Sequence, residues 1–389
     1  MDIQKTCETY VSNTYKRYPV AFVRGEGAHL WDDAGREYVD LGSGIAVNIF
    51  GVSDPEWVEA VTGQLRALPH TSNLYYTEPC AHLAEMLCGR TGMKKVFFSN
   101  SGAEANECMI KAARRYGEAA GRYAIVTLKN SFHGRTIATL AATGQDAFHR
   151  HFGPFPDGFA YAQPDDLESV RALAEERNAC AVMLEIVQGE GGVHALDGDF
   201  LRGVQSLCRE RNMLLCVDEV QTGNGRCGEL YAYMAHGLAP DLVSTAKGLG
   251  GGLPIGATLF AESVQDVLGA GDHGSTFGGN PVACAGAASI LSRIDDGLLK
   301  GVCERGAYIQ DALRGAKGVR GVSGMGLMLG IETERSAAEV VKACLARGVL
   351  VLTAKDRVRL LPPLNISWDD LKAGIALPQK ALGGESACG

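Results

Sequence analysis

Two acids and one lysine stand directly after two apolar runs in the middle of the chain. Residues 214–217 lead into Asp218 and Glu219, and residues 242–243 lead towards Lys247, which glycines follow. Strands of parallel sheets read as short apolar runs, and ligands collect at their carboxyl ends. A lysine there can form a Schiff base with pyridoxal phosphate, and an acid on a neighbouring strand can keep the cofactor's ring nitrogen protonated. The alternative interpretation is that Lys247 is a surface lysine and Asp218 caps a helix.

The segment after the apolar run at residues 96–98 is suited to hold a phosphate group. Residues 99–106 open a predicted helix that Ser101 or Gly102 can cap. The free N–H groups and the positive end of a helix attract anions, and small residues permit close approach. A capped helix without a ligand is the common alternative. Residues 273–281 place two hydroxyls among glycines, where they could donate to a phosphate or simply form a loop.

Two arginines and a glutamate could contact a substrate that carries carboxylates. Arg135 could bind a carboxylate through two hydrogen bonds, and Phe132 beside it could stack on a cofactor ring. Arg359 lies in an apolar run, where an arginine needs an acid partner or an anionic ligand. Glu190, flanked by glycines, is better placed near a substrate than Glu185 in the same segment. A solvated loop acid is the alternative for Glu190.

Composition limits the class of protein. The chain has 389 residues, of which 46% are hydrophobic and 21% charged, as in soluble globular proteins of two domains. A net charge of -8 argues against binding nucleic acid or an anionic membrane surface. The 12 cysteines include no C-x-x-C pair, which indicates thiols in a reducing compartment and no metal site. The N-terminus has no signal-peptide pattern and no run of about 18 apolar residues occurs, so we expect a cytoplasmic protein.

The apolar runs predict the elements that must position these residues. Seven of them alternate with helical stretches, which predicts an α/β fold with a mostly parallel seven-stranded sheet. The runs are residues 96–98, 124–126, 159–161, 181–187, 214–217, 242–243 and 256–260, and the clearest helices are expected at 103–116, 167–177 and 200–211.

Both ends of the chain are expected to form a second, smaller α+β domain. Residues 1–60 read as a helical arm followed by short antiparallel strands at 21–23 and 37–40, and a long helical stretch starts near residue 285. Further strands are expected at 321–331, 348–353 and 358–361, and the glycine-rich residues 324–330 read as a β-turn followed by a strand. We therefore predict a large domain at 61–285 and a small domain from 1–60 and 286–389, with residues 383–386 disordered.

Taken together and in order, these segments resemble the class III pyridoxal-phosphate-dependent aminotransferases of fold type I. The resemblance extends from about residue 10 to about residue 375. It is carried by residues 44–48, 70–79, 96–107, 132–136, 185–192, 217–223, 246–256, 273–281 and 359–367.

The resemblance implies a role for each matching residue. It implies that Lys247 is the Schiff-base lysine, that Asp218 partners the ring nitrogen and that Glu190 is a switch acid paired with Arg359. Further cofactor contacts are implied for Gly102 and Ala103 at the phosphate, Phe132 on the ring, Gln221 near the ring hydroxyl, Glu185, Glu219 and Val220. Thr276 would reach the phosphate of the other subunit in a homodimer with shared active sites. Substrate contacts are implied for Arg135, Glu190, Ser275 and Arg359.

The implied activity is transfer of the terminal amino group of N2-acetyl-L-ornithine to 2-oxoglutarate in arginine biosynthesis. Transaminases of succinylornithine, succinyldiaminopimelate, ornithine or 4-aminobutyrate would share the same cofactor residues, and an aminomutase or a non-enzymatic binding protein remain as other classes. Two departures from the family pattern stand out. Residues 50–55 lack both histidines of the G-H-x-H-P motif, and residues 185–188 read E-I-V-Q in place of E-P-I-Q.

Overall fold

A seven-stranded sheet forms the centre of the structure, a computed structural model that describes residues 2–382. Its strands lie in the order β4 (Lys95–Ser99), β12 (Gly256–Phe260), β11 (Leu242–Thr245), β10 (Leu214–Asp218), β7 (Ala179–Leu184), β5 (Ala124–Leu128) and β6 (Phe159–Ala162). Strand β12 runs antiparallel to both of its neighbours, and the other pairs are parallel. The predicted α/β fold with a mostly parallel sheet is confirmed, and each of the seven apolar runs supplies one strand.

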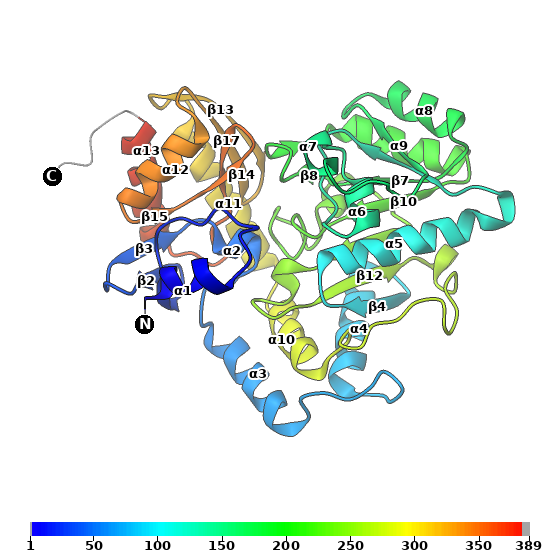
Figure 1. Cartoon of the computed structure of the whole chain (residues 1–389), viewed down its shortest axis with the longest axis horizontal. Coiled ribbons are helices and arrows are strands. Elements are labelled where there is room, and N and C mark those ends of the chain that lie inside the picture. Colours follow the sequence, from blue (N-terminus) through cyan, green and yellow to red (C-terminus); the bar gives the residue numbers. More distant parts are fainter. Residues whose placement is uncertain (1, 383–389) are drawn as a thin grey trace.

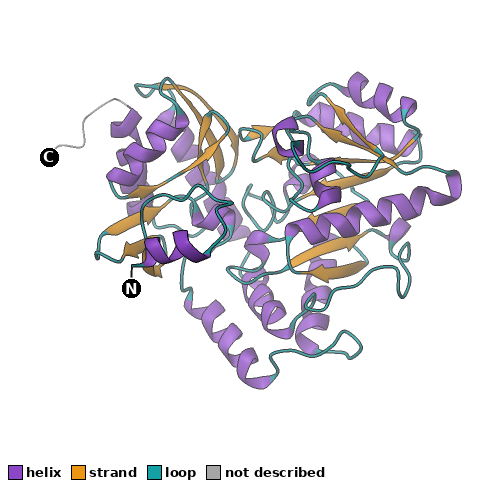
Figure 2. Cartoon of the chain, in the orientation of Figure 1, coloured by secondary structure: helices purple, strands orange, loops and turns teal. Residues whose placement is uncertain are grey.

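Helices cover both faces of this sheet because its central strands are apolar on both sides (Figure 2). In β10 the first and third residues join a buried cluster with α5 (Gly102–Gly117). The second and fourth residues belong to the larger core with α8 (Leu167–Glu176) and α9 (Gly198–Glu210). Side chains of a strand alternate between its faces, so an unbroken apolar run is the signature of a sheet buried between two helix layers.

Two smaller sheets lie on the other side of the molecule, near both ends of the chain (Figure 1). One has the order β1 (Phe22–Glu26), β2 (His29–Asp32), β3 (Glu37–Asp40) and β15 (Val349–Leu350), so it joins N-terminal and C-terminal strands. The other has the order β13 (Val319–Met325), β14 (Met328–Thr333), β17 (Arg357–Leu360) and β16 (Leu352–Ala354). The domain boundaries at residues 60 and 285 stay a prediction.

The C-terminal strands are shorter than the apolar runs suggest. Residues 319–333 form a hairpin with the expected turn and strand at 324–330, because Gly326 adopts a φ of 56° and reverses the chain between paired Met325 and Met328. Residues 348–353 divide between β15 and β16, which pair with different sheets. A run of apolar residues shows that a segment is buried, but it does not show that neighbouring residues of the run pair with strands of two different sheets. The segment at 383–386 lies outside the described residues.

The remaining elements connect the sheets and cover their edges. The helices are α1 (Ile3–Tyr10), α2 (Ser43–Ala46), α3 (Pro55–Ala67), α4 (Glu78–Thr91), α6 (Ile137–Ala142), α7 (Asp146–His149), α10 (Pro281–Ser292), α11 (Asp296–Leu313), α12 (Ala337–Ala346) and α13 (Trp368–Leu382). Short 3-10 helices are η1 (Glu118–Ala120), η2 (Ala232–His236), η3 (Lys247–Leu249) and η4 (Glu262–Val264), and a small ribbon pairs β8 (Val187–Gln188) with β9 (His194–Ala195). None of the helices described between residues 2 and 382 is long and apolar enough to span a bilayer.

Candidate active site

A cavity of about 600 Å³ lies at the carboxyl ends of β10 and β11. The parallel pairing of these strands sets Asp218 beside Ser244, three residues before Lys247. This is the position at which open α/β sheets bind ligands. Most of the predicted site residues line the cavity: Gly102, Ala103, Phe132, Arg135, Glu185, Asp218, Val220, Gln221 and Lys247.

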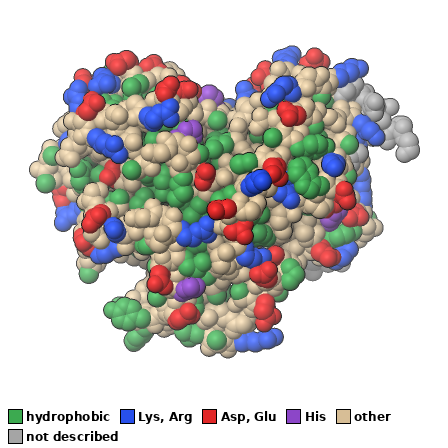
Figure 3. Space-filling view, turned by 180° about the vertical axis from the view of Figure 1, so that it is seen from behind, with side chains coloured by type: hydrophobic (Ala, Val, Ile, Leu, Met, Phe, Trp, Pro, Cys, Tyr) green, Lys and Arg blue, Asp and Glu red, His purple; other side chains and the backbone are tan. Residues whose placement is uncertain are grey.

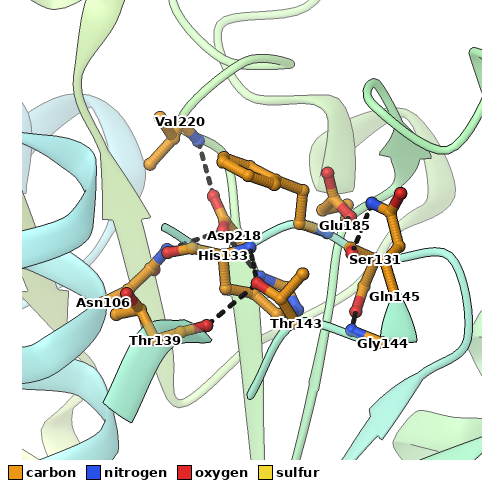
Figure 4. A network of polar contacts seen from close by, with 11 residues as sticks. Asn106, Ser131, His133, Thr139, Thr143, Gly144, Gln145, Glu185, Asp218 and Val220 are labelled. Atoms are coloured by element: carbon orange, nitrogen blue, oxygen red, sulfur yellow. Dashed lines mark hydrogen bonds and ion pairs between the residues drawn. The ribbon is translucent and has the colours of Figure 1, made fainter. Parts of the chain in front are cut away.

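Asp218 is held in place by donors on both of its oxygens (Figure 4). Oδ2 accepts from Asn106 Nδ2 at 2.7 Å and lies 2.8 Å from Nδ1 of His133. Oδ1 accepts from the N–H of Val220 at 3.0 Å. Asn106 also donates to the backbone carbonyl of His133 at 2.7 Å, so its amide ties the His133 backbone to the acid. A carboxylate held in this way can face a cationic ring nitrogen without reorienting.

Lys247 lies half-buried at the turn where β11 ends, with a φ of 46°. A left-handed conformation is costly for a residue with a side chain and is found mostly where function requires it. Burial lowers the pKa of Lys247 and so favours the neutral amine. The negative charge of Glu190 acts in the opposite direction but is the smaller effect. Asn224 supports the turn from behind, because its Nδ2 donates to the carbonyl of Ala246 at 3.2 Å.

The N-terminus of α5 forms one end of the cavity. Ser101 caps the helix by accepting from the N–H of Glu104 at 3.2 Å, which leaves the first N–H groups of the helix facing the cavity. A Cβ on Gly102 would lie 2.6 Å from Cγ1 of Val220, so the narrow gap between these residues admits only glycine. Such a glycine-walled helix terminus is suited to an anion.

Arg359 is buried and paired with an acid. Its Nη1 donates to Oε1 of Glu190 at 2.6 Å and to Oε1 of Gln221 at 2.9 Å, and the residue is 2% exposed. Burial opposes ionisation of Glu190, but the charge and hydrogen bond of Arg359 outweigh it and lower the pKa of that carboxyl. Gln221 lines the cavity and Arg359 does not, so the side chain of Gln221 lies between the arginine and the cavity.

Arg135 occupies a different environment at the mouth of the cavity. Its side chain is exposed, and its guanidinium lies 4.2 Å from the ring centre of Phe148 and 5.5 Å from that of Phe132. The N–H of Phe132 donates to Oε2 of Glu185 at 3.0 Å. Burial, together with the neighbouring charge of Asp218, raises the pKa of Glu185 well above its usual range, which favours the protonated acid.

Three predicted residues lie away from the cavity. The side chain of Glu219 turns to the opposite side of the backbone from Asp218, where Oε1 accepts from the N–H of Tyr233 at 2.8 Å. Ser275 is tied to its own loop and to Asn100 Nδ2, which donates to its Oγ at 3.1 Å. Thr276, next in this loop, is exposed and is not part of the lining of this chain's own cavity.

Sequence reasoning missed three residues that the structure brings to the site. The sequence pattern assigns no role to His133 or Asn106, yet both hold Asp218. Tyr15, from the N-terminal arm, lines the cavity although 200 residues separate it from β10. Asn106 lies four residues after Gly102 on the same helix, and this spacing could have placed it one turn behind the phosphate end. Nothing in its local sequence marks Tyr15.

These residues fit pyridoxal phosphate. A half-buried lysine, a fixed carboxylate and a helix terminus with a glycine gap surround one cavity large enough for a small cofactor. Lys247 would hold the cofactor covalently, Asp218 would face its ring nitrogen, and the first residues of α5 would hold its phosphate.

Comparisons with known proteins agree with this geometry. The family model described as "Aminotransferase class-III" matches residues 10–382. The chain is 48% identical to the acetylornithine aminotransferase of Haemophilus ducreyi over 98% of both chains, and 43% identical to that of Caldanaerobacter subterraneus over 96% of this chain and 97% of the relative.

Solved structures show the same fold. An N-acetylornithine aminotransferase from Stenotrophomonas maltophilia superposes with a TM-score of 0.85 at 33% identity, covering 98% of both chains. An ornithine aminotransferase from Toxoplasma gondii superposes with a TM-score of 0.94 at 31% identity, covering 98% of this chain and 94% of the other. On the strength of the family match, the near full-length relatives and the cofactor-shaped site, this chain belongs to the class III aminotransferases, which are pyridoxal-phosphate-dependent enzymes.

Proposed function

We propose that this enzyme transfers the terminal amino group of N2-acetyl-L-ornithine to 2-oxoglutarate, giving N-acetyl-L-glutamate 5-semialdehyde and L-glutamate. Support comes from curated relatives named acetylornithine aminotransferase, which are 43% to 48% identical over nearly the whole chain. The ornithine aminotransferases among the solved structures are only 30% to 31% identical. The reaction would serve arginine biosynthesis in the cytoplasm.

The pairing of Arg359 with Glu190 is the observation that carries this proposal. The two substrates differ at the reacting carbon: glutamate carries a carboxylate there, and acetylornithine does not. With Arg359 held 2.6 Å from Glu190, its charge is neutralised for the donor. If Glu190 turns away, the same guanidinium can bind the carboxylate of glutamate or 2-oxoglutarate. Arg135, exposed at the cavity mouth, would bind the carboxylate at the far end of either substrate.

The remaining site residues divide the chemical work. Pyridoxal phosphate, when bound, supplies the electron sink for the bond broken at the substrate carbon. The buried Nζ of Lys247, with its lowered pKa, is suited to take a proton from that carbon and return it at the neighbouring position. Asp218, fixed by His133 and Asn106, would hold the proton on the ring nitrogen. Because the donor and acceptor use the site in turn, ping-pong kinetics are expected.

A homodimer would complete each site. Apolar side chains are exposed on the loop between α3 and α4 and on the loop before α10: Leu74 is 87% exposed, Tyr75 69%, Tyr76 105% and Phe277 59%. Figure 3 shows hydrophobic side chains gathered on the protruding lower part of the molecule. Exposed apolar patches of this kind mark protein interfaces. Thr276 lies beside Phe277, and in a dimer it would reach the phosphate bound by the other subunit.

Mixed dimers test the shared site directly. A chain carrying Lys247→Ala but normal Thr276 should complement a chain carrying Thr276→Val but normal Lys247. The hybrid then contains one site with both native residues and should hold one cofactor per dimer as tightly as the wild type. Hybrids that bind no better than the Thr276→Val homodimer would exclude the shared-site arrangement.

A substrate panel tests the reaction. Purified holoenzyme is given acetylornithine, succinylornithine, ornithine or 4-aminobutyrate with 2-oxoglutarate, and glutamate formation is measured. We expect the highest kcat/KM with acetylornithine. A higher value with another donor would reassign the substrate within the family, and reaction without any 2-oxoglutarate would indicate an aminomutase.

A further inference from the structure

Arg226 is a fully buried charge that the reaction does not use. It lies in the loop after β10, is 1% exposed and is among the largest completely buried side chains of the structure. Burial lowers its pKa to about 10, so it remains cationic at neutral pH. A buried guanidinium requires hydrogen-bond acceptors, because an unpaired charge in the interior is strongly destabilising. The acceptors that the fold provides therefore indicate what the residue is for.

Those acceptors belong to the C-terminal sheet. Nη1 of Arg226 donates to the carbonyl of Pro362 at 2.5 Å and to the carbonyl of Leu327 at 3.2 Å. The N–H of Leu327 in turn donates to the carbonyl of Arg226 at 3.0 Å. Leu327 is in the turn of the β13–β14 hairpin, and Pro362 lies two residues after the end of β17. Arg226 thus joins the loop behind the cofactor cavity to the two segments that frame Arg359.

Two arginines cross between the same two segments in opposite directions. Arg226 reaches from the loop after β10 to Pro362, three residues beyond Arg359. Arg359 reaches back from β17 to Gln221, five residues before Arg226, at 2.9 Å. The Arg359 contact must break or change when Glu190 moves and a carboxylate enters. The Arg226 contact involves a backbone carbonyl and no substrate, so it can persist throughout the reaction.

We propose that Arg226 is a positioning residue that holds the backbone after β17 against the loop after β10. The guanidinium of Arg359 then stays in place to bind a carboxylate when Glu190 moves away. This inference rests on the proposed function for its kinetic consequence, but not for its structural one. Without Arg226, the strand end can move away from Gln221, and the guanidinium of Arg359 would bind the incoming carboxylate less well. The donor half-reaction, in which Arg359 is not a substrate ligand, should change little.

The test compares Arg226→Met and Arg226→Lys with Arg90→Met as a control. Arg90, which is exposed, also donates to two backbone carbonyls, those of Leu291 and Ile294, and neither acceptor belongs to the C-terminal strands. Single-turnover absorbance measurements on the holoenzyme follow the glutamate and donor half-reactions separately. In Arg226→Met, kcat/KM for glutamate should fall about tenfold relative to the donor, the effect of one lost charge-assisted hydrogen bond. Arg226→Lys, which keeps one donor group, should show a smaller shift, and Arg90→Met none.

A crystal structure of each folded variant decides the same question independently of substrate. In the Arg226 variants, Nη1 of Arg359 should no longer lie within hydrogen-bond distance of both Glu190 and Gln221. Equal losses in both half-reactions with those two bonds intact would reduce Arg226 to a structural role and overturn the proposal. If Arg226→Met does not fold, the lysine variant carries the test. A wild-type enzyme without a glutamate half-reaction would refute the proposed function, while the crystal structures would still decide the role of Arg226.

Discussion

Replacing Glu190 with glutamine would leave the guanidinium of Arg359 buried without a carboxylate. Arg359 is 2% exposed, and the lowered pKa of Glu190 means that its partner is ionised at neutral pH. The Glu190→Gln side chain can still accept a hydrogen bond through its amide oxygen, but it no longer neutralises the charge. The donor, which presents no carboxylate to Arg359, would then bind beside an uncompensated cation. Glutamate would bring its own counter-charge.

The size of this effect follows from the contact at 2.6 Å. A hydrogen bond to a charged group is worth about 1.5 to 3 kcal/mol, and tenfold in rate corresponds to about 1.4 kcal/mol. The side chain of Glu190 is 29% exposed, so solvent screens the pair only in part. We therefore expect the ratio of kcat/KM for glutamate to that for acetylornithine to rise about 10- to 100-fold.

Stopped-flow absorbance of the bound cofactor measures both half-reactions on the same preparation. Glu332→Gln is a suitable control, because Glu332 pairs with Arg357 at 3.6 Å on the same strand pair without contacting Arg359. That variant should leave the ratio unchanged. An equal loss in the two half-reactions of Glu190→Gln, or a ratio no different from the control, would refute the masking role of Glu190.

Cofactor retention, pH dependence and turnover test other parts of the site. Gly102→Ala should weaken retention of pyridoxal phosphate during dialysis, since the added methyl would stand 2.6 Å from a neighbouring side chain, whereas Gly89→Ala, with nothing within 4 Å, should not. Burial raises the pKa of Glu219 from 4.5 to about 7, so the folded state favours the neutral acid and loses stability as pH rises through that window, by on the order of 3 kcal/mol. Urea midpoints of Glu219→Gln should accordingly vary less between pH 5 and 8 than those of the wild type, and parallel curves would contradict this. His133→Phe removes one donor from Asp218 and should lower kcat about tenfold with the cofactor still bound; an unchanged kcat would show that the histidine only fills space.

Much of the fold could be predicted because the order of apolar residues within a short segment shows which of its faces are buried. Each of the seven apolar runs became one strand of the main sheet, and their unbroken apolar character reflects burial on both faces. Ser101 and Gly102 showed where α5 begins, because capping depends on residues within one turn. At 319–333 the glycines predict a turn and a strand, but only the structure shows that the residues on either side of the turn pair with each other.

Local sequence patterns were enough to predict a lysine and an aspartate at neighbouring strand ends and a helix terminus suited to phosphate. The side chains that support this chemistry could be identified only from contacts between residues distant in the chain. Glu190 and Arg359 meet across 169 residues, and Asn106 and Asp218 across 112. Such contacts depend on how every intervening element packs, whereas strand ends and caps depend on near neighbours. The same reason explains why Glu219, adjacent to Asp218, faces away from the cavity: alternation along an extended backbone separates the two acids.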